Sequence, residues 1–525
     1  MTSAALLINY LNEIFPTWVS TCLTWKMHQG KQHGLVDCID EIEKQKYKLI
    51  LCPDSASNDY AEHARIKAYG GNTIVLDHHL ADKISEDAII INNQLSKYPN
   101  KELSGVGVVW QFCRYIDSKL NIHNADNYLD LVALGLCGDM MSLRSFETRY
   151  LITKGLKKCN IKNPFIEGMI EKNEFPLSKA DYVSADESMA CTSMGAAFFI
   201  VPFVNALTRS GTQEEKELLF KSMLDSYAFK KVLSNKRGHK QGEEETILAQ
   251  ALRTATNVKN RQTRAEDAGM ALLEAKIKEN CLLQHKILLF LLKENEIEPN
   301  IRGLVANKMM AKYQRPCLVL SYSAEKRMFE GSGRGYTKTG INSFKDILQD
   351  CGCVAYAQGH DNAMGCGIPE EQIQKFIEET DRILQDVSTE PIYRVDYELL
   401  DTQNNSQIIL DIGNMNDYWG QDIDRAYVSI NFKMTDNNIA IMKSNTFKIT
   451  LPYNISIIKF NITEEELNNF SKILQNSPSI EINAICKCAV NKWNGNSYPQ
   501  LVLQDWEIVD ASTYTVPKKY SFESF

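Results

Sequence analysis

Acidic and histidine side chains follow three apolar segments of this sequence. Carboxylates and imidazoles that meet at one place can hold divalent metals such as Mn²⁺ or Mg²⁺. Two such metals can clamp a phosphate oxygen and turn bound water into hydroxide near neutral pH. The candidates are Asp54 after LILCP, Asp77-His78-His79 in TIVLDHH, and Asp139 in GLCGDMM.

The position of each of these residues can also be explained without any catalytic or binding role. A single aspartate at a strand end is most often a helix cap or part of a turn. The pair His78-His79 directly after Asp77 is harder to explain by packing, because two imidazoles near a buried strand need polar partners. The pattern therefore favours a site at this position.

The elements that would position these residues alternate between strands and helices up to about residue 160. Apolar, β-branched runs predict strands over 47–54, 72–79 and 88–93. The segment 59–71 predicts a helix that ends at Gly70-Gly71. This alternation is typical of a doubly wound α/β domain, whose active sites lie at the carboxyl ends of the strands.

The remaining segments suggest further folded regions. The chain opens with TSAALLINYLNEIF, a helix so apolar that we expect it to be buried. Residues 160–300 look mostly helical, with one long helix or a broken pair between Glu243 and Glu294. A second α/β unit and a small β-barrel or sandwich follow. Their predicted parts are a strand at 317–323, a Gly-rich turn at 331–336, a helix near 343–350, and short strands from about 390.

Composition narrows the function classes. The 525-residue chain carries 58 basic and 66 acidic residues, a net charge of −8, which argues against bulk attraction to nucleic acid but not against a local basic groove. Its 14 cysteines are scattered and include no CxxC pair, which favours reduced cysteines in a cytosolic protein. No apolar run reaches membrane-spanning length, and the N-terminus has no secretory signal pattern.

Several of these segments resemble a known family. LDHHLAD resembles the signature of the DHH phosphoesterase superfamily, and LCPDSASND, LSGVGVVWQF and ALGLCGDMMSLRSFETRYLITKGL resemble motifs of its RecJ-like branch of single-stranded-DNA exonucleases. Later segments resemble the groove-lining stretch P-x-x-N-A-x-x-R-x-G, the DHH-associated domain and the last strands of a RecJ-type OB-fold. These are VPFVNALTRSG, GLVANKMMAKYQRPCLVL with GSGRG and GHDNAMG, and NKWNGNSYPQLVLQDWEI. The ordered set covers essentially the whole chain.

The resemblance implies roles for the acids and histidines. Asp54 would bridge two metals, and His78 and Asp139 would complete most of the second metal's shell. His79 would contact the scissile phosphate, and Asp77 would support His79 from behind. The implied cofactors are Mn²⁺ or Mg²⁺, binuclear in the family, with the possibility of a single site here.

It also implies substrate-binding residues downstream. Glycines of the second domain would let backbone N–H groups approach a phosphate, although ordinary tight turns explain them as well. An arginine on a helix surface is likewise a fair alternative for the groove residue. The implied set is Asn205 and Arg209 in the groove, and Ser332, Arg334, Gly359 and His360 at the phosphate or terminal nucleotide. Candidates for base stacking are Tyr418, Trp419, Trp493 and Tyr498, whereas Trp506 is expected to pack inside the barrel.

The resemblance implies an α/β architecture of four parts. They are a DHH domain (1–190), a helical segment with a long connecting helix (191–295), a DHH-associated domain (296–388) and an OB-fold-like domain (389–525). The implied function is metal-dependent 5′→3′ degradation of single-stranded DNA in recombination, repair or phage DNA metabolism. A DNA-binding accessory protein with impaired catalysis and a DHH phosphodiesterase for short oligonucleotides are the alternatives. We expect a cytoplasmic monomer, host- or phage-encoded, with a helicase or single-strand-binding protein as a further partner.

One motif of that family has no counterpart in the sequence. The family's first motif, Asp-x-Asp-x-Asp-Gly, stands on a strand before a helix that often begins Thr-Ser, and here Thr2-Ser3 follow Met1 directly. Three explanations are open: an upstream segment omitted or encoded separately, a chain that binds DNA without cutting it, or other residues in the missing role. We favour the first, because the other motifs are intact.

Overall fold

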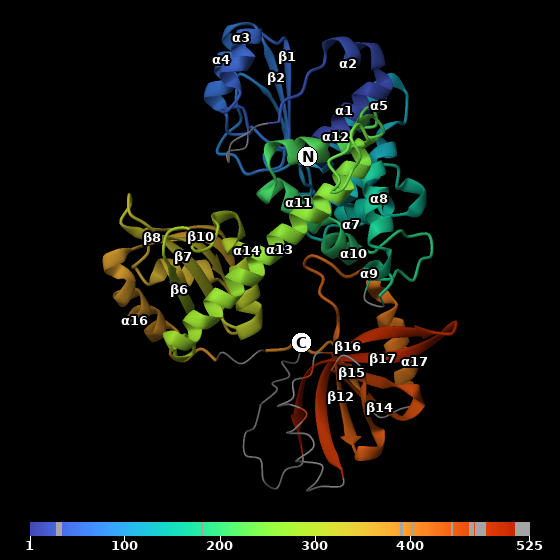
Figure 1. The fold of residues 1–525 in the computed structure, drawn as a ribbon, viewed down its shortest axis with the longest axis vertical. Helices are drawn as coiled ribbons and strands as arrows, with labels where there is room; N and C mark the ends of the chain where they lie inside the picture. The colour runs from blue at the N-terminus through green and yellow to red at the C-terminus, as the bar shows by residue number, and fades with distance from the viewer. Residues whose placement is uncertain are drawn as a thin grey trace. The chain divides into compact units, whose positions relative to one another are not determined.

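The chain forms two compact units, which are coloured along the sequence in Figure 1. The computed structural model describes residues 1–27, 34–179, 182–388, 392–400, 404–442, 445–460, 462, 467 and 479–509. Unit 1 comprises residues 1–205, 212–254 and 395–525, and unit 2 comprises residues 206–211 and 255–394. The division into four domains stays a prediction.

A parallel three-stranded sheet positions the acids and histidines of unit 1. Its order is β1-β2-β3, with β1 at Leu49–Pro53, β2 at Asn72–Asp77 and β3 at Ile89–Asn92. Because the strands are parallel, the residues that follow them lie at one edge of the sheet. The three predicted strands and the α/β class are confirmed.

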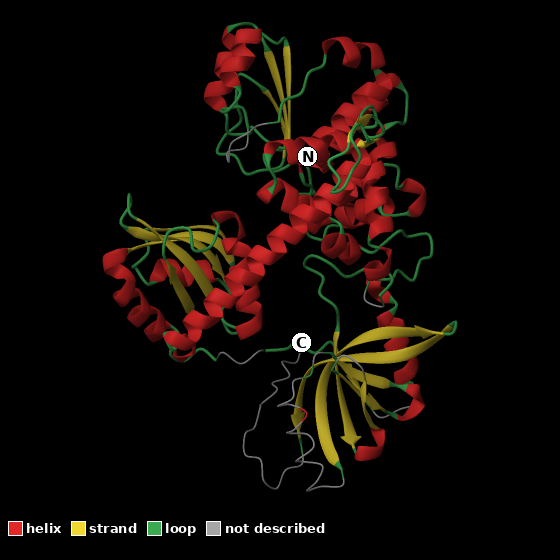
Figure 2. Ribbon diagram, viewed as in Figure 1, coloured by secondary structure: helices red, strands yellow, loops and turns green. Residues whose placement is uncertain are grey.

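Helices pack around this sheet (Figure 2). The first, α1 (Thr2–Ile14), buries its apolar side chains as predicted, and the hydroxyl of Tyr10 donates to Asp117 Oδ1 at 2.8 Å. Asp117 lies on helix α5 (Gly105–Leu120), so this bond ties the two helices together. The helices are α2 (Pro16–Cys22), α3 (Ile39–Gln45), α4 (Tyr60–Ala68), α5 (Gly105–Leu120) and α6 (Leu129–Gly138).

The middle of the chain is largely helical, as predicted. It contains α7 (Phe146–Gly155), α8 (Pro164–Lys172), α9 (Glu174–Leu177), α10 (Ser193–Phe199), α11 (Val201–Ser210), α12 (Gln213–Ser222), β4 (Lys231–Leu233), β5 (Glu244–Thr246) and α13 (Ile247–Glu279). The prediction that helix continues to Glu294 is wrong. Cys281 adopts a left-handed conformation (φ 51°) just after α13, and LLFLL forms strand β6, because a short apolar run fits a buried strand as well as a helix.

Unit 2 contains a five-stranded sheet in the order β6-β7-β8-β10-β9. Its strands and helices are β6 (Leu288–Leu292), α14 (Pro299–Tyr313), β7 (Cys317–Ser323), β8 (Met328–Arg334), α15 (Phe344–Asp350), β9 (Tyr356–His360), β10 (Ala363–Pro369) and α16 (Ile373–Ile383). The predicted turn at 331–336 is corrected, since Gly331–Arg334 belong to β8. A Cβ at Gly331 would lie 2.1 Å from the carbonyl oxygen of Val319, so close backbone packing explains the glycine.

The last described part of the chain is β-rich, as expected. Its seven-stranded sheet has the order β11-β12-β16-β17-β15-β14-β13 around an apolar core, against which Trp506 packs as predicted. The OB-fold itself stays a prediction. The elements are β11 (Tyr397–Leu399), α17 (Asn405–Gly413), β12 (Tyr427–Met434), β13 (Ile439–Met442), β14 (Thr446–Thr450), β15 (Ser456–Lys459), β16 (Ile480–Trp493) and β17 (Asn496–Ile508).

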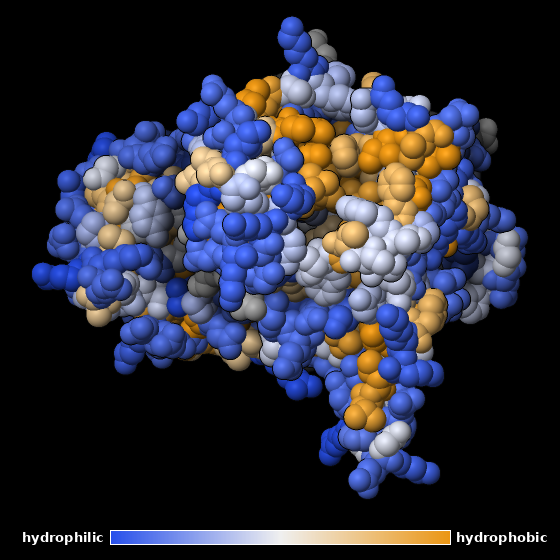
Figure 3. All heavy atoms as spheres, turned by 90° about the horizontal axis from the view of Figure 1, so that it is seen from above, coloured by the Kyte–Doolittle hydropathy of each residue, from blue (hydrophilic) through white to orange (hydrophobic). Residues whose placement is uncertain are grey.

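The surface is mixed in character. Figure 3 shows one face on which hydrophilic side chains predominate and apolar ones gather in a few patches. Exposed apolar residues include Phe15, which lies between α1 and α2, and Trp18 on α2; they are 42% and 40% exposed. Among the described residues, no helix combines the length and apolarity needed to cross a membrane.

A buried histidine makes the stability of unit 1 dependent on pH. His63 on α4 is 0% exposed and neither ring nitrogen has a hydrogen-bond partner among the described residues. Burial lowers the pKa of His63, and nearby carboxylates such as that of Asp59 oppose this only in part. The folded state therefore excludes a proton that the unfolded state binds below its pKa of about 6.5.

We expect the free energy of unfolding to fall as the pH drops from about 7.5 to about 5.5, by up to about 1.4 kcal/mol per pH unit from His63. Urea unfolding at both pH values measures this change. The variant His63→Leu should lose that part of the pH dependence, and an unchanged dependence in the variant would contradict the assignment.

Candidate active site

Asp77 organises the chain at the carboxyl end of β2. The side chain is 1% exposed, and its Oδ1 accepts hydrogen bonds from the backbone N–H of His78 (2.8 Å) and His79 (3.3 Å). The same oxygen lies 2.7 Å from Nδ1 of His79, and Oδ2 accepts from the backbone N–H of Ser57 at 3.2 Å. Asp77 thus turns the chain and orients the His79 ring, which fits a supporting role.

The structure brings Asp54, His78 and His79 together. One ligand atom of each lies within 4.8 Å of the others, and His78 Nε2 is 3.4 Å from Asp54 Oδ1. Asp54 directly follows β1 in a left-handed conformation (φ 68°), which its short polar side chain tolerates, and its N–H donates to Leu76 O at 2.7 Å. This hydrogen bond holds the end of β1 against the end of β2, where the side chains of Asp54 and His78 project.

The donor set fits a divalent cation. Asp54 Oδ1 is buried and has no hydrogen-bond partner within the described part of the chain. A buried carboxylate oxygen without a partner is costly unless a positive charge satisfies it. One carboxylate and imidazole nitrogens suit Mn²⁺ or other borderline divalent metals. Asp54 and His78 could therefore hold such an ion, with His79 beside it.

Asp139 lies beside this group but outside the three-residue cluster. It follows α6 with its side chain exposed at the surface, yet desolvation of its carboxylate by the surrounding chain, together with the charge of Asp54, raises its pKa to about 6. Two neighbouring carboxylates repel when both are ionised, and a cation between them would remove that repulsion. Asp139 could therefore serve as a further ligand.

The protonation of the two histidines differs. Burial lowers the pKa of His78, which keeps its ring neutral and able to bind a metal. The hydrogen bond to Asp77 raises the pKa of His79, which favours its protonated form. Burial alone would raise the pKa of Asp77, but hydrogen bonds from His79 and Ser57 lower it to about 2, so Asp77 stays ionised.

Sequence reasoning missed two supporting residues. Asn92 lies opposite Asp77 in the register, and its Nδ2 donates to His79 O at 2.8 Å and to Ser57 Oγ at 2.9 Å. Gly105 begins α5, and a Cβ there would lie 1.9 Å from Asp54 Oδ1. In the sequence, Asn92 is marked only by its place at the polar end of the predicted strand 88–93. Gly105 is marked only by the Gly-rich helix start LSGVGVVWQF.

The turn after Asp139 is fixed by distant segments of the same unit. The N–H of Ser142 donates to Glu102 Oε2 at 3.1 Å, and the N–H of Leu143 donates to the carbonyl oxygen of Gln421 at 3.0 Å. The C-terminal segment thus contributes to the position of the Asp139 turn.

In unit 2, the sheet aligns three of the predicted substrate-binding residues. Arg334 on β8 and His360 on β9 both pair with Ala363 on β10, the strand between them. The side chains of Arg334 and His360 therefore lie on one face of the sheet. Ser332 precedes Arg334 by two positions on that face. A Cβ at Gly303 of α14 would lie 2.6 Å from Arg334 Nη2 and 3.5 Å from Ser332 Oγ, so this glycine makes room for both.

The other predicted residues surround this face in different ways. Burial and the charge of Arg209 lower the pKa of Arg334, so the two cations are neighbours in unit 2. Asn205 precedes Arg209 by one turn on α11 but belongs to unit 1. Gly359 has a φ of 129°, which non-glycine residues rarely adopt.

The aromatic candidates differ in exposure. Tyr418 and Trp493 are 52% and 68% exposed, and Trp493 stands at the turn between β16 and β17. The carbonyl oxygen of Trp419 accepts a hydrogen bond from Ser193 Oγ at 2.7 Å. Tyr498 is half-buried on β17. Their role in base stacking stays a prediction.

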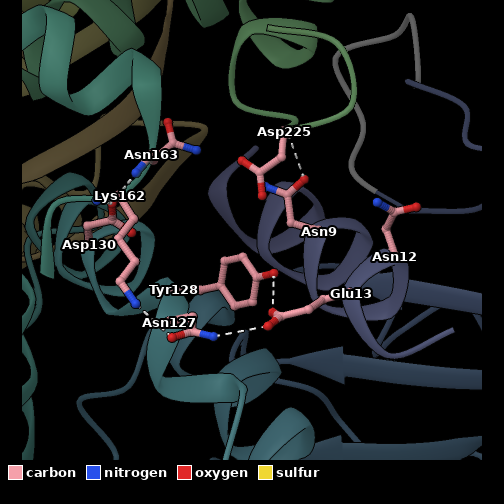
Figure 4. A pocket seen from close by; sticks show the side chains of 9 residues that line it. All are labelled: Asn9, Asn12, Glu13, Asn127, Tyr128, Asp130, Lys162, Asn163 and Asp225. Atoms are coloured by element: carbon pink, nitrogen blue, oxygen red, sulfur yellow. Dashed lines mark hydrogen bonds between the residues drawn. The ribbon is translucent and has the colours of Figure 1, made fainter. Parts of the chain in front are cut away.

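A polar cavity of about 380 Å³ lies beside α1 (Figure 4). Glu13 accepts hydrogen bonds there from Tyr128 Oη (2.7 Å) and Asn127 Nδ2 (3.1 Å). Its walls are Asn9, Asn12, Glu13, Asn127, Tyr128, Asp130, Lys162, Asn163 and Asp225. None of the predicted site residues lines this cavity. It is therefore separate from the group of Asp54, His78 and His79, which we call the Asp54 cluster.

Comparisons with known proteins agree with this architecture. The DHH family N-terminal domain model matches residues 1–136. The chain is 32% identical, over 97% of its length and 85% of the relative's, to YorK of Bacillus subtilis (strain 168), provisionally named an SPbeta prophage-derived single-strand DNA-specific exonuclease. It is 24% identical to the single-stranded-DNA-specific exonuclease RecJ of the same organism, over 89% of this chain and 56% of RecJ.

Solved structures share the fold. A crystal structure of RecJ from Thermus thermophilus in complex with Mn²⁺ superposes with a TM-score of 0.67 at 16% identity, covering 97% of this chain and 67% of that one. The corresponding Mg²⁺ complex gives a TM-score of 0.57 at 16% identity, covering 90% and 69%. By its similarity to YorK over nearly its whole length, together with the DHH-domain match, the chain belongs to the RecJ-like branch of the DHH family.

Proposed function

We propose that this chain is a metal-dependent exonuclease that degrades single-stranded DNA with Mn²⁺ or Mg²⁺. The observation that carries the proposal is the cluster of Asp54, His78 and His79 at the ends of two parallel strands. The similarity to YorK and RecJ, both named as single-strand-specific exonucleases, supports the choice of substrate. We extend the proposal to 5′→3′ polarity and to a role in recombination, repair or phage DNA metabolism.

The residues of the chain divide the proposed work. A divalent cation, when bound, neutralises phosphate charge and activates water. Asp54 and His78, with Asp139 nearby, would hold the cation. Asp77 holds Nδ1 of His79, so that Nε2 of the protonated ring can donate a hydrogen bond to the scissile phosphate.

Residues of unit 2 would bind the end of the strand. Arg334 is a guanidinium on a sheet face that also carries Ser332 and His360, all of which can donate hydrogen bonds to phosphate oxygens. Arg209 adds a second positive charge near Arg334. We propose that this face holds a phosphate while the Asp54 cluster performs the hydrolysis.

A cleavage assay on end-labelled oligonucleotides tests the proposal. With Mn²⁺, the chain should shorten 5′-phosphorylated single strands stepwise from the 5′ end, should leave duplexes of equal length intact, and should stop on addition of EDTA. The double variant His78→Ala with Asp139→Ala should no longer cleave DNA but should still bind it. If the chain binds single strands but never cuts them with any divalent metal, the exonuclease proposal fails and an accessory DNA-binding role replaces it.

A further inference from the structure

A stretch between α12 and α13 is basic, although Asp225 precedes it and Glu243, Glu244 and Glu245 follow it. Residues 226–242 contain five lysines and arginines together with His239 and no acidic residue, in a protein whose net charge is −8. They include β4 and the loop of the β4–β5 hairpin, which directly precedes α13 (the small yellow pair in Figure 2). The positive charge is therefore concentrated in the loop between β4 and β5, whereas β5 itself carries glutamates.

The cations of this hairpin are available to a ligand. Lys236, Arg237 and Lys240 are exposed, and no carboxylate of the described chain forms an ion pair with any of them. Elsewhere in the protein, other exposed lysines pair with carboxylates, as Lys326 does with Glu330 at 2.9 Å. Like charges without ion-pair partners repel one another, and a bound anion relieves that repulsion.

The hairpin is held in a defined shape at its base. Arg253 of α13 pairs with Glu245 at 2.5 Å and donates to Asn235 Oδ1 at 2.6 Å. Gln250 donates to Glu245 Oε1 and to the carbonyl oxygen of Leu233, both at 3.1 Å. Glu245 is thus satisfied at the base and does not neutralise the cations of the loop. The carboxylate of Glu243 accepts a hydrogen bond from the backbone N–H of Lys240 at 2.9 Å and so stabilises the turn.

Aromatic and apolar side chains occur on the same segment of the chain. Phe229 is 64% exposed and Leu233 is 70% exposed, and Lys230 lies 4.0 Å from the centre of the Tyr227 ring. Cations and an exposed aromatic group on one segment suit a nucleic-acid strand, whose phosphates and base faces need both kinds of contact.

We propose that the β4–β5 hairpin, through Lys236, Arg237 and Lys240, is a second binding site for the phosphodiester backbone of single-stranded DNA, separate from the Asp54 cluster. The inference rests on the proposed function for the choice of DNA as the polyanion. Because an acidic protein cannot attract DNA through its overall charge, a local basic element of this kind supplies the attraction.

The salt dependence of binding tests this site without any cleavage. Binding of a labelled single-stranded oligonucleotide is measured in EDTA over a range of KCl concentrations. Each phosphate contact contributes about 0.7 to the slope of log K against log salt, so the triple variant K236Q/R237Q/K240Q should lower the magnitude of the slope by about 2 and the affinity about fiftyfold near 0.15 M salt. The matched control K44Q/K46Q/K48Q removes the same charge from three exposed lysines around the start of β1 and should leave the slope unchanged.

The outcomes separate the two proposals. If the unaltered chain fails to bind single strands, the proposed function fails. If it binds, but the hairpin variant and the control have the same slope, the hairpin site is wrong. Vesicles with anionic phospholipid provide a further comparison, and a loss of vesicle binding in the hairpin variant without a loss of DNA binding would overturn the assignment to DNA.

Discussion

Replacing Asp54 with asparagine is expected to reduce Mn²⁺-dependent cleavage about a thousandfold, the upper end of the range for removing one electrostatic group from an active site. The Asp54 carboxylate interacts with two other members of the site. His78 Nε2 lies 3.4 Å from its Oδ1, and its charge raises the pKa of Asp139. Asparagine keeps the shape but loses the negative charge that balances a divalent cation. Initial rates at saturating oligonucleotide measure the change.

The variant Asp126→Asn is a suitable control, because that carboxylate belongs to a surface ion pair with Lys154 in the same unit. It removes the same charge, and we expect nearly unchanged rates. Mn²⁺ affinity, measured by calorimetry, should fall in Asp54→Asn and stay constant in Asp126→Asn. Equal rates in the two variants would contradict the assignment of Asp54 as a ligand.

Substituting alanine for Gly105 is expected to lower the affinity for Mn²⁺ and the cleavage rate about a hundredfold, as changes around metal ligands do. The added Cβ would lie 1.9 Å from Oδ1 of Asp54 and 2.6 Å from its Cβ, so the carboxylate has to leave its present position. Calorimetric titration with Mn²⁺ and cleavage rates both report this displacement.

A matched glycine distinguishes displacement from a general loss of stability. A Cβ at Gly340 would meet only Val387, at 3.9 Å, so Gly340→Ala should leave metal affinity and rate unchanged. Urea unfolding of both variants shows whether Gly105→Ala is still folded under the assay conditions. A folded Gly105→Ala variant with unchanged Mn²⁺ affinity would show that the Asp54 side chain is not the ligand.

Much of the fold was predictable because its signals are local. The strands that end at Asp54 and Asp77 are apolar β-branched runs, and the burial of α1 follows from its composition. Strand β6 was missed because its five apolar residues follow a long helix-forming segment and carry no turn signal of their own. The glycines from Gly331 to Gly333 suggested a turn, whereas close strand packing requires them.

The site was predictable only in part, for a physical reason. Asp54, His78 and His79 stand in recognisable sequence patterns, but the bonds of Asn92 to Ser57 and His79 depend on how β2 and β3 align. Register of this kind is set by packing of the whole sheet and leaves no periodic pattern in the sequence. The same holds for Arg334 and His360, which share a face only because of the strand order β8-β10-β9.

The most direct test of a metal centre at Asp54 is the anomalous scattering of Mn²⁺ in crystals soaked with MnCl₂. We predict a peak within about 2.0–2.3 Å of Asp54 Oδ1 and His78 Nε2, the distance range of such metal–ligand bonds. The peak should disappear in crystals of Asp54→Asn. Well-ordered crystals in which Mn²⁺ binds elsewhere, with no peak beside Asp54 and His78, would contradict the account.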